Sequence, residues 1–257
     1  MRILVRTSKW AVWARRFGAL ALPLALIPVL LHRGHIISSD NFVVIEGVAT
    51  VLAVVAVAMA LIAFVRLWFT GDHGWSRATL AFVFGIVCLI PAGLFGWLAA
   101  SIPASADVST DFSDPPVLVS FVESRFIGPD ERARIEAAYP NARSRNYPIE
   151  APQMFNVIDN LIDAYGWDMR ARRAPQGPLD NGQLNAVVTT LLGFSEEVAI
   201  RVVGGTDGTT VDMRSTSLSS FPDFGENGQR VERFLLELDN QVTLMLRNAP
   251  TQQPAAD

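Results

Sequence analysis

The chain has 257 residues, hydrophobic side chains at 50% of its positions and a formal charge of −4 at pH 7. This charge is unevenly distributed: residues 1–105 carry eight basic and three acidic side chains, whereas residues 106–257 carry thirteen basic and twenty-two acidic ones. Because contacts to phosphates need clustered cations, the acidic part is expected to bind no nucleic acid.

Three long apolar stretches occupy the N-terminal part, and each is predicted to form a transmembrane helix, because about 20 apolar residues cross a bilayer core. The predicted helices cover about residues 17–33, 42–66 and 78–100. One such stretch alone could be a buried helix of a soluble protein. Three in succession, separated by short loops, favour a membrane anchor of residues 1–105 with the lipid bilayer as its partner.

The charges that flank these stretches predict the orientation. Five basic residues and no acidic one precede the first stretch, and short cationic flanks stay in the cytoplasm. An odd number of spans then carries the following domain across the membrane. We therefore expect a multi-pass protein of a bacterial inner membrane, with a cytoplasmic N-terminus and a periplasmic, or otherwise extracytoplasmic, C-terminal domain. The basic residues are Arg2, Arg6, Lys9, Arg15 and Arg16.

The segment after the third stretch allows two interpretations. Ala104-Ser105-Ala106 has the small-x-small pattern of a signal-peptide cleavage site, and cutting there would release the C-terminal domain. The third stretch is longer than the apolar region of a signal peptide, which favours a linker. The sequence does not decide whether this site is ever cleaved.

Residues 106–248 are predicted to form one α+β domain, and residues 249–257 a disordered tail. Amphipathic periodicity predicts a helix over 150–165, and an acidic first turn predicts one over 129–138. Alternating side chains predict strands over 167–172, 184–192, 198–202 and 211–217, and a last helix covers 227–246. Helices on one face of an antiparallel four-stranded sheet give a two-layer domain.

The register of the last two strands follows from their side-chain alternation. Val198, Ile200 and Val202 must share a face with Val211 and Met213, and a slip of one residue would bury charge. This register pairs Arg201 with Asp212 on the opposite face, where we expect an exposed cross-strand ion pair. The neighbouring acids Glu196 and Glu197 point to opposite faces, so they are a poor acid–base couple and are expected to be solvated.

The acidic part contains no His, Cys or Lys, since His32, His35, His73 and Cys88 all precede residue 106. This excludes Ser-His-Asp and Cys-His catalysis, Schiff-base chemistry and the usual zinc and iron sites in that part. No cofactor is expected. Carboxylate catalysis and oxygen-ligated calcium remain chemically open. The acids of residues 107–114 do not match an EF-hand loop, and a solvated linker is the favoured interpretation.

Five polar residues between the last strand and the last helix form the candidate binding site. The helix N-terminus could present backbone N–H groups to an anion in a small polar pocket. The same residues could instead cap the helix and satisfy backbone groups, and this structural interpretation is favoured because every helix start needs such partners. The five residues are Arg214, Ser215, Ser217, Asp223 and Asn227.

Five segments of the acidic part stand in a distinctive order and spacing: Thr110–Pro116, Tyr165–Trp167, Gly193–Val202, Val211–Ser217 and Asp223–Asn227. By these segments the acidic part resembles the DUF1499 domain, a domain of unknown function found in bacteria and plastids. The resemblance implies the fold and a membrane anchor ahead of the domain, but no activity. Leu218 stands where the family usually has arginine, and Glu196-Glu197 stands where it usually has two aspartates.

The functional expectation is a non-catalytic envelope protein whose exported domain contacts another envelope protein or a small ligand. One alternative is a hydrolase or lyase that uses carboxylates and Arg214, which would need two acids about 5–10 Å apart in a cleft. Another is an accessory subunit of a membrane transport or assembly complex. The sequence does not determine the oligomeric state.

Overall fold

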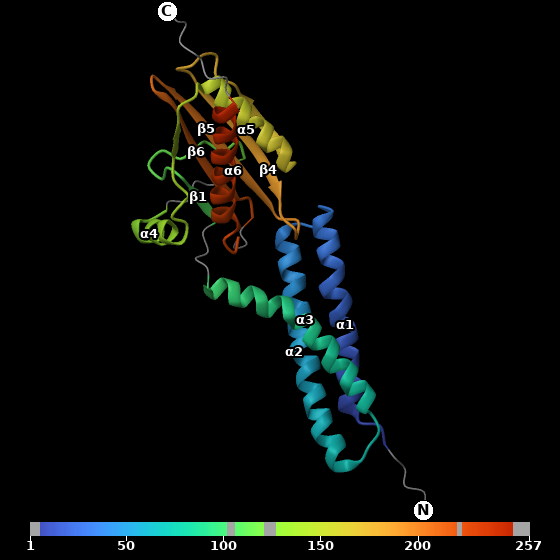
Figure 1. Ribbon diagram of the computed structural model, residues 1–257. Coiled ribbons are helices and arrows are strands. Elements are labelled where there is room, and N and C mark those ends of the chain that lie inside the picture. The colour runs from blue at the N-terminus through green and yellow to red at the C-terminus, as the bar shows by residue number, and fades with distance from the viewer. Residues whose placement is uncertain (1–5, 102–105, 121–126, 220–222, 249–257) are drawn as a thin grey trace, which may run out of the picture. The chain divides into compact units, whose positions relative to one another are not determined.

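The computed structural model describes residues 6–101, 106–120, 127–219 and 223–248 (Figure 1). The chain forms two compact units: one comprises residues 1–101 with 191–194, and the other comprises the remainder. Most of the Ala104-Ser105-Ala106 segment and the whole tail after residue 248 lie outside the described residues. The cleavage and tail predictions therefore stay predictions.

The N-terminal unit consists of three helices, α1 (Lys9–Arg33), α2 (Ser39–Thr70) and α3 (Trp75–Ser101). Each is long and apolar enough to cross a membrane by length and composition. All three are longer than the apolar stretches that predicted them, because the flanking polar residues continue the helix. Figure 1 shows α3 bending along its length, and Pro91 lies within it, where proline removes a backbone hydrogen bond and kinks the helix.

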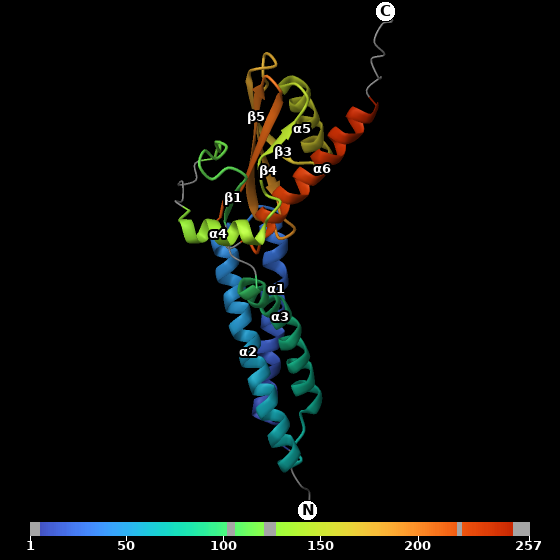
Figure 2. The ribbon, with the colours of Figure 1, turned by 60° about the vertical axis from the view of Figure 1, so that its left-hand side comes forward.

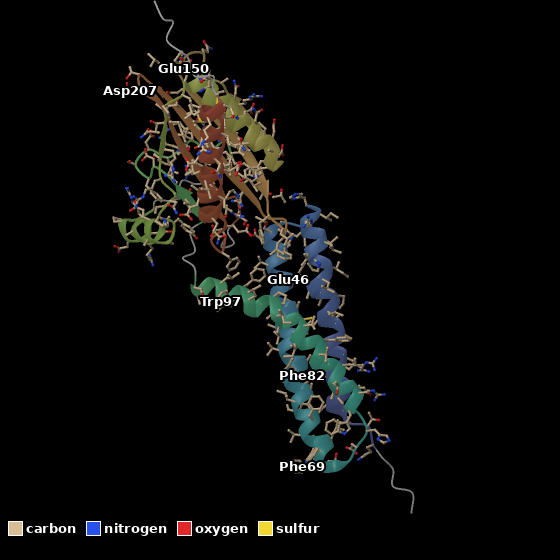
Figure 3. All side chains as sticks on the ribbon, in the orientation of Figure 1. Glu46, Phe69, Phe82, Trp97, Glu150 and Asp207 are labelled. Atoms are coloured by element: carbon tan, nitrogen blue, oxygen red, sulfur yellow. The ribbon has the colours of Figure 1, made fainter. Side chains whose placement is uncertain are left out.

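Small residues line the seam between these helices. In lipid, helices associate by close packing, which small side chains permit. A Cβ atom added to Gly85 of α3 would lie 2.5 Å from Cγ2 of Val57 and 3.0 Å from the carbonyl oxygen of Ala53, both on α2. Large apolar side chains such as Phe69, which is 81% exposed near the end of α2, point outward (Figure 3). Among the described residues, the alanines of these helices with no exposed surface are Ala11, Ala14, Ala21, Ala53, Ala56, Ala60, Ala63, Ala78 and Ala81.

The substitution Gly85→Leu is expected to destabilise the helical bundle, because overpacking a tight contact costs about 1–3 kcal/mol. Gly93→Leu on the same helix is the matched control, since a Cβ at Gly93 would meet nothing within 4 Å. Thermal unfolding of the detergent-solubilised protein, followed by circular dichroism, measures the difference. Equal melting temperatures for the two variants would contradict the packing seam.

The described residues of the C-terminal unit form a six-stranded antiparallel sheet and three helices. The predicted four-stranded sheet is therefore wrong, because two strands of only three residues also pair with β6, along the edge that β5 leaves open. The strand order is β1-β6-β5-β4-β3, with β2 beside β6 as well. The elements in chain order are β1 (Asp107–Ser109), α4 (Pro129–Ala138), β2 (Arg145–Tyr147), α5 (Ala151–Tyr165), β3 (Asp168–Arg173), β4 (Asn181–Thr189), β5 (Ser195–Gly205), β6 (Gly208–Ser217) and α6 (Glu226–Asn248).

Helices α5 and α6 cover one face of the sheet (Figure 2), and the apolar core lies between them and the strands. Helix α5 ends at Gly166, whose φ of +67° is the left-handed C-cap that glycine favours. The buried stripe of α6 follows the predicted spacing from Val231 to Val242, although Met245, which the same spacing includes, is 39% exposed. The sheet contributes Leu184, Ala186, Val198, Ile200, Val202, Val211 and Met213 to this core.

The predicted register of β5 and β6 is confirmed. Val202 lies opposite Val211, Ile200 opposite Met213, and Arg201 opposite Asp212. The alternation therefore sends these apolar side chains toward α5 and α6, and Glu197, Arg201 and Asp212 to the other face.

This second, polar face is covered by residues 110–120, which follow β1 and are here named the strap. Figure 2 shows α5 and α6 on one side of the strands and the segment that follows β1 on the other. The interpretation of residues 107–114 as a solvated linker is wrong, because β1 pairs with β6 and the acids of this segment bond to Arg201 and Arg214 of the sheet. The backbone N–H of Thr110, at the start of the strap, donates to the carbonyl oxygen of Met213. The prolines that follow exclude regular strand pairing, and beyond them side chains of the sheet make the contacts.

Candidate functional site

The sheet separates the five predicted site residues into two groups. Ser215 and Ser217 alternate on β6 and point toward α6, where Asn227 and Asp223 meet them. Arg214 directly precedes Ser215 in sequence and therefore projects from the opposite face. Four of the five residues thus form one cluster, and Arg214 belongs to a different network.

Asn227 is the centre of the helix-side cluster and has no exposed surface. Its Oδ1 accepts a hydrogen bond from Ser215 Oγ at 2.7 Å, and its Nδ2 donates to Ser217 Oγ at 3.0 Å and to the carbonyl oxygen of Ala106 at 3.3 Å. These bonds join β6, α6 and the residue before β1. A buried amide with both ends satisfied is what a structural role requires.

Asp223 caps the start of α6. Its Oδ1 accepts from the backbone N–H of Gly225 at 3.1 Å and its Oδ2 from that of Asn227 at 3.0 Å. These are two of the N–H groups that a helix start leaves without intrahelical partners. Burial raises the pKa of Asp223, while the hydrogen bonds from Gly225 and Asn227 act in the opposite direction. The capping geometry agrees with the structural interpretation of the cluster.

Two residues that the sequence analysis did not assign to the site complete this cluster. Glu196 of β5, 2% exposed, forms an ion pair with Arg230 of α6, and Arg230 Nη1 also donates to Ser215 Oγ and Asn227 Oδ1 at 3.0 Å each. Burial raises the pKa of Glu196 to about 7, against the lowering effect of Arg230. The sequence contained a signal for this pair, since Arg230 lies on the buried stripe of α6, four residues before Phe234.

The expectation that Glu196 and Glu197 are solvated is wrong. They point to opposite faces as predicted, but both faces are covered, and Glu197 has no exposed surface. Its Oε1 accepts from the backbone N–H of Val119 at 2.6 Å and its Oε2 from that of Ser120 at 2.9 Å. Asn185 Nδ2 also donates to Glu197 Oε1, at 3.0 Å. The strap is what buries this carboxylate.

Arg214 is held on the polar face by Asp107 of β1. Its Nε and Nη2 donate to the two carboxylate oxygens of Asp107 at 2.9 and 2.5 Å, and its Nη1 donates to the carbonyl oxygen of Pro116 at 3.4 Å. Both side chains are about 10% exposed. A bidentate, buried pair of this kind fixes β1 and the strap to β6.

The predicted pair of Arg201 and Asp212 forms, but it is not exposed. Arg201 Nη2 donates to Asp212 Oδ2 at 2.9 Å, and the Asp212 side chain is 5% exposed because the strap and Ser144 lie over it. Arg201 also reaches Asp114 Oδ2 at 2.6 Å and Asp111 Oδ2 at 3.5 Å in the strap. Hydrogen bonds from Ser113, aided by Arg201, hold the pKa of Asp111 below its ordinary value.

An open pocket of about 420 Å³ lies at the other end of the β5–β6 hairpin, away from all five predicted residues. It is lined by residues 146–148 and 205–210, and Asp207 marks the hairpin tip in Figure 3. Gly208 has a φ of +134°, and a Cβ there would lie 2.1 Å from the carbonyl oxygen of Tyr147. The turn is therefore restricted to glycine at this position.

Within the described ranges, no three His, Cys, Asp or Glu side chains are grouped so as to hold a metal ion. The acids of residues 107–114 instead bond to Arg214, to Arg201 and to backbone N–H groups of their own turn.

The C-terminal unit matches the family model described as a protein of unknown function (DUF1499) over residues 107–238. The chain belongs to the DUF1499 family. The match runs from β1 into α6, so it contains the sheet, the strap and both polar networks. Comparisons with curated proteins and with solved structures found no match.

Glu196 predicts a pH dependence of stability. Because its folded-state pKa is raised from about 4.5 to about 7, the native state binds its proton more tightly than the unfolded state. Its contribution to the free energy of unfolding is therefore fully present below pH 4.5 and is lost as the pH rises toward 7. Glu196→Gln is expected to remove this loss, which amounts to about 3 kcal/mol.

Pulse proteolysis in urea at pH 5 and pH 8 measures the effect, with Glu237→Gln on the outer side of α6 as the matched control. The control should keep the wild-type difference between the two pH values, whereas Glu196→Gln should reduce it. An unchanged difference in Glu196→Gln would contradict a neutral Glu196 at acidic pH.

Proposed function

We propose that this DUF1499 protein is a non-catalytic envelope protein whose three-helix anchor holds an interaction domain outside the cytoplasm. One observation carries this proposal: the charged side chains of the family segments are directed at each other. Arg214 is bound to Asp107, Arg201 to Asp212, Glu196 to Arg230, and Glu197 to the strap. Acids and bases used in catalysis need access to a substrate, whereas these groups are buried in ion pairs and hydrogen bonds that stabilise the fold.

The extracytoplasmic position of the domain is supported by charge and span number. Five basic residues precede α1 without an acid, and three helices are long and apolar enough to cross a membrane. By the positive-inside tendency, the domain then lies in the periplasm of a bacterial cell. An acidic domain is also suited to that space, because it does not adhere to anionic lipid headgroups.

Reporter fusions test this orientation. Alkaline phosphatase joined after Asn248 is expected to be active, and a cytoplasm-only fluorescent protein joined there is expected to be dark. Fusions after Gly71, between α2 and α3, form the matched control and should give the reverse result. A fluorescent fusion after Asn248 together with an inactive phosphatase fusion would refute the proposed topology.

Interaction with an envelope protein is tested by photo-crosslinking in cells. A crosslinking amino acid at exposed positions of the domain is expected to give one discrete adduct, identified by mass spectrometry, with the unmodified chain as background. Absence of any adduct from all three positions would contradict a protein partner at these surfaces. The positions are Leu179, Asp207 and Leu236.

A carboxylate-dependent hydrolase or lyase is the second candidate, favoured by Glu196, because a pKa of about 7 suits a general acid. Arg214, which this candidate would also use, lies on the other face of the sheet. The two candidates differ in their response to Glu196→Gln: a partner adduct survives this substitution in the interaction proposal, whereas a cellular function that depends on catalysis is lost. A role as an accessory subunit of a transport or assembly complex would appear as a transporter or assembly protein in the adduct.

A further inference from the structure

We propose that the polar face of the sheet is a binding site for an extended, acidic segment of a partner protein, and that the strap occupies this site until the partner displaces it. The inference rests on the proposed interaction function and names the surface and the chemistry of its partner. Three features of the strap support it: what the sheet recognises, where the strap carries charge, and how the strap is held.

The sheet recognises the main chain of the strap. Asn185 Nδ2 and Gln183 Nε2 donate to the carbonyl oxygen of Val117 at 2.8 and 2.6 Å. Glu197 accepts from two successive backbone N–H groups, those of Val119 and Ser120. Main-chain groups are common to every extended peptide, so the same side chains can bind a segment of another protein.

The side chains of the strap play a smaller part on this stretch. Val117 is 68% exposed and Val119 is 56% exposed, so their apolar groups point away from the sheet. The polar face therefore does not depend on these side chains to hold the segment. A partner with different residues at these two positions keeps the hydrogen bonds of the main chain.

Arg201 adds a requirement for acidic residues. It binds Asp114 at 2.6 Å and Asp111 at 3.5 Å in the strap while remaining paired with Asp212 of β6. Asp114 is 82% exposed, so its carboxylate is presented at the rim, where a partner's carboxylate can replace it. The recognised segment is therefore extended and carries a carboxylate a few residues before the main-chain contacts.

Phe112 near the start of the strap packs against the apolar core, and Pro116 is buried. Beyond Pro116, Val117 and Val119 are exposed, and the strap is held by hydrogen bonds to Gln183, Asn185 and Glu197 of the sheet. This part buries little apolar surface, and such segments open at a lower free energy than the core does. Glu197 and Asn185 become hydrated when the strap leaves, so opening does not strand a buried charge. Strand β1, with the Asp107–Arg214 pair, keeps its place on β6 and anchors one end of the strap.

A second copy of this chain is a weaker occupant than a partner protein. Its strap would make the same contacts as the tethered strap, which competes at an effective concentration on the order of 1 mM. A displacing segment must therefore bind more tightly than the strap itself. This condition favours a partner with an extended acidic segment over self-exchange.

The test uses the full chain in detergent and a fluorescein-labelled peptide with the sequence of residues 110–120. The double variant Asp111→Asn/Asp114→Asn weakens the tethered strap but retains the oxygen of residue 111 that accepts from Ser113. Fluorescence polarisation is expected to show at least tenfold tighter peptide binding to the double variant than to the wild type. A peptide carrying the same two asparagines should bind the double variant several-fold more weakly.

Adding Gln183→Ala to the double variant tests the main-chain contacts. This substitution removes the hydrogen bond from Gln183 to the carbonyl oxygen of Val117, and its half-buried position lies outside the apolar core. It should reduce peptide binding several-fold while the melting temperature stays unchanged. Equal binding of the peptide to wild type and double variant, or equal binding of the acidic and asparagine peptides, would overturn the inference. Light scattering that shows the double variant as a dimer would assign the site to a second copy and overturn it as well.

This outcome is separable from the failure of the proposed function. Crosslinking from Leu179, Asp207 and Leu236 probes other surfaces. Adducts at these positions without peptide binding would support the interaction function and refute only the binding site on the polar face. Peptide binding without any cellular adduct would support the binding site on the polar face and contradict a protein partner at the three crosslinking positions.

Discussion

Two adjacent carboxylates on the same strand dictate how the domain is covered. Glu196 and Glu197 of β5 point to opposite faces of the sheet, and each is at most 2% exposed. A buried carboxylate is costly unless it is paired or hydrogen-bonded, so each face must supply a partner. On one face Arg230 of α6 does so, and on the other the backbone N–H groups of the strap do. The strap is thus part of the fold, although it contains little regular structure.

The family segments are rich in Asp, Arg, Ser and Glu, residue types that also form catalytic sites. In the folded domain these side chains contact one another: Arg214 is paired with Asp107, and Asn227 is hydrogen-bonded to both Ser215 and Ser217. In this chain these residues hold β1, β6, α6 and the strap together.

The anchor obeys the opposite rule, because its outer surface is apolar and its seam is built from small side chains. Close approach at Ala53, Ala60 and Gly85 allows helices to pack without the hydrophobic driving force that water provides. The C-terminal domain gathers Leu, Ile and Val between sheet and helices, and pairs its buried charges with each other, beneath the strap and between β5 and α6. The anchor thus exposes its large apolar side chains and buries small ones, whereas the C-terminal domain buries its large apolar side chains.

The sequence by itself determined what depends on local periodicity: three long apolar helices, the amphipathic α5 and α6, and the register that sets Arg201 opposite Asp212. It did not predict β1 and β2, because three residues are too few for an alternating pattern. It also did not predict that Glu196, Glu197 and Asp212 are buried. Alternation decides which face a side chain points to, but what covers that face comes from segments many residues away, such as the strap and Arg230. Only the tertiary structure brings those segments together, because their contacts leave no period in the chain.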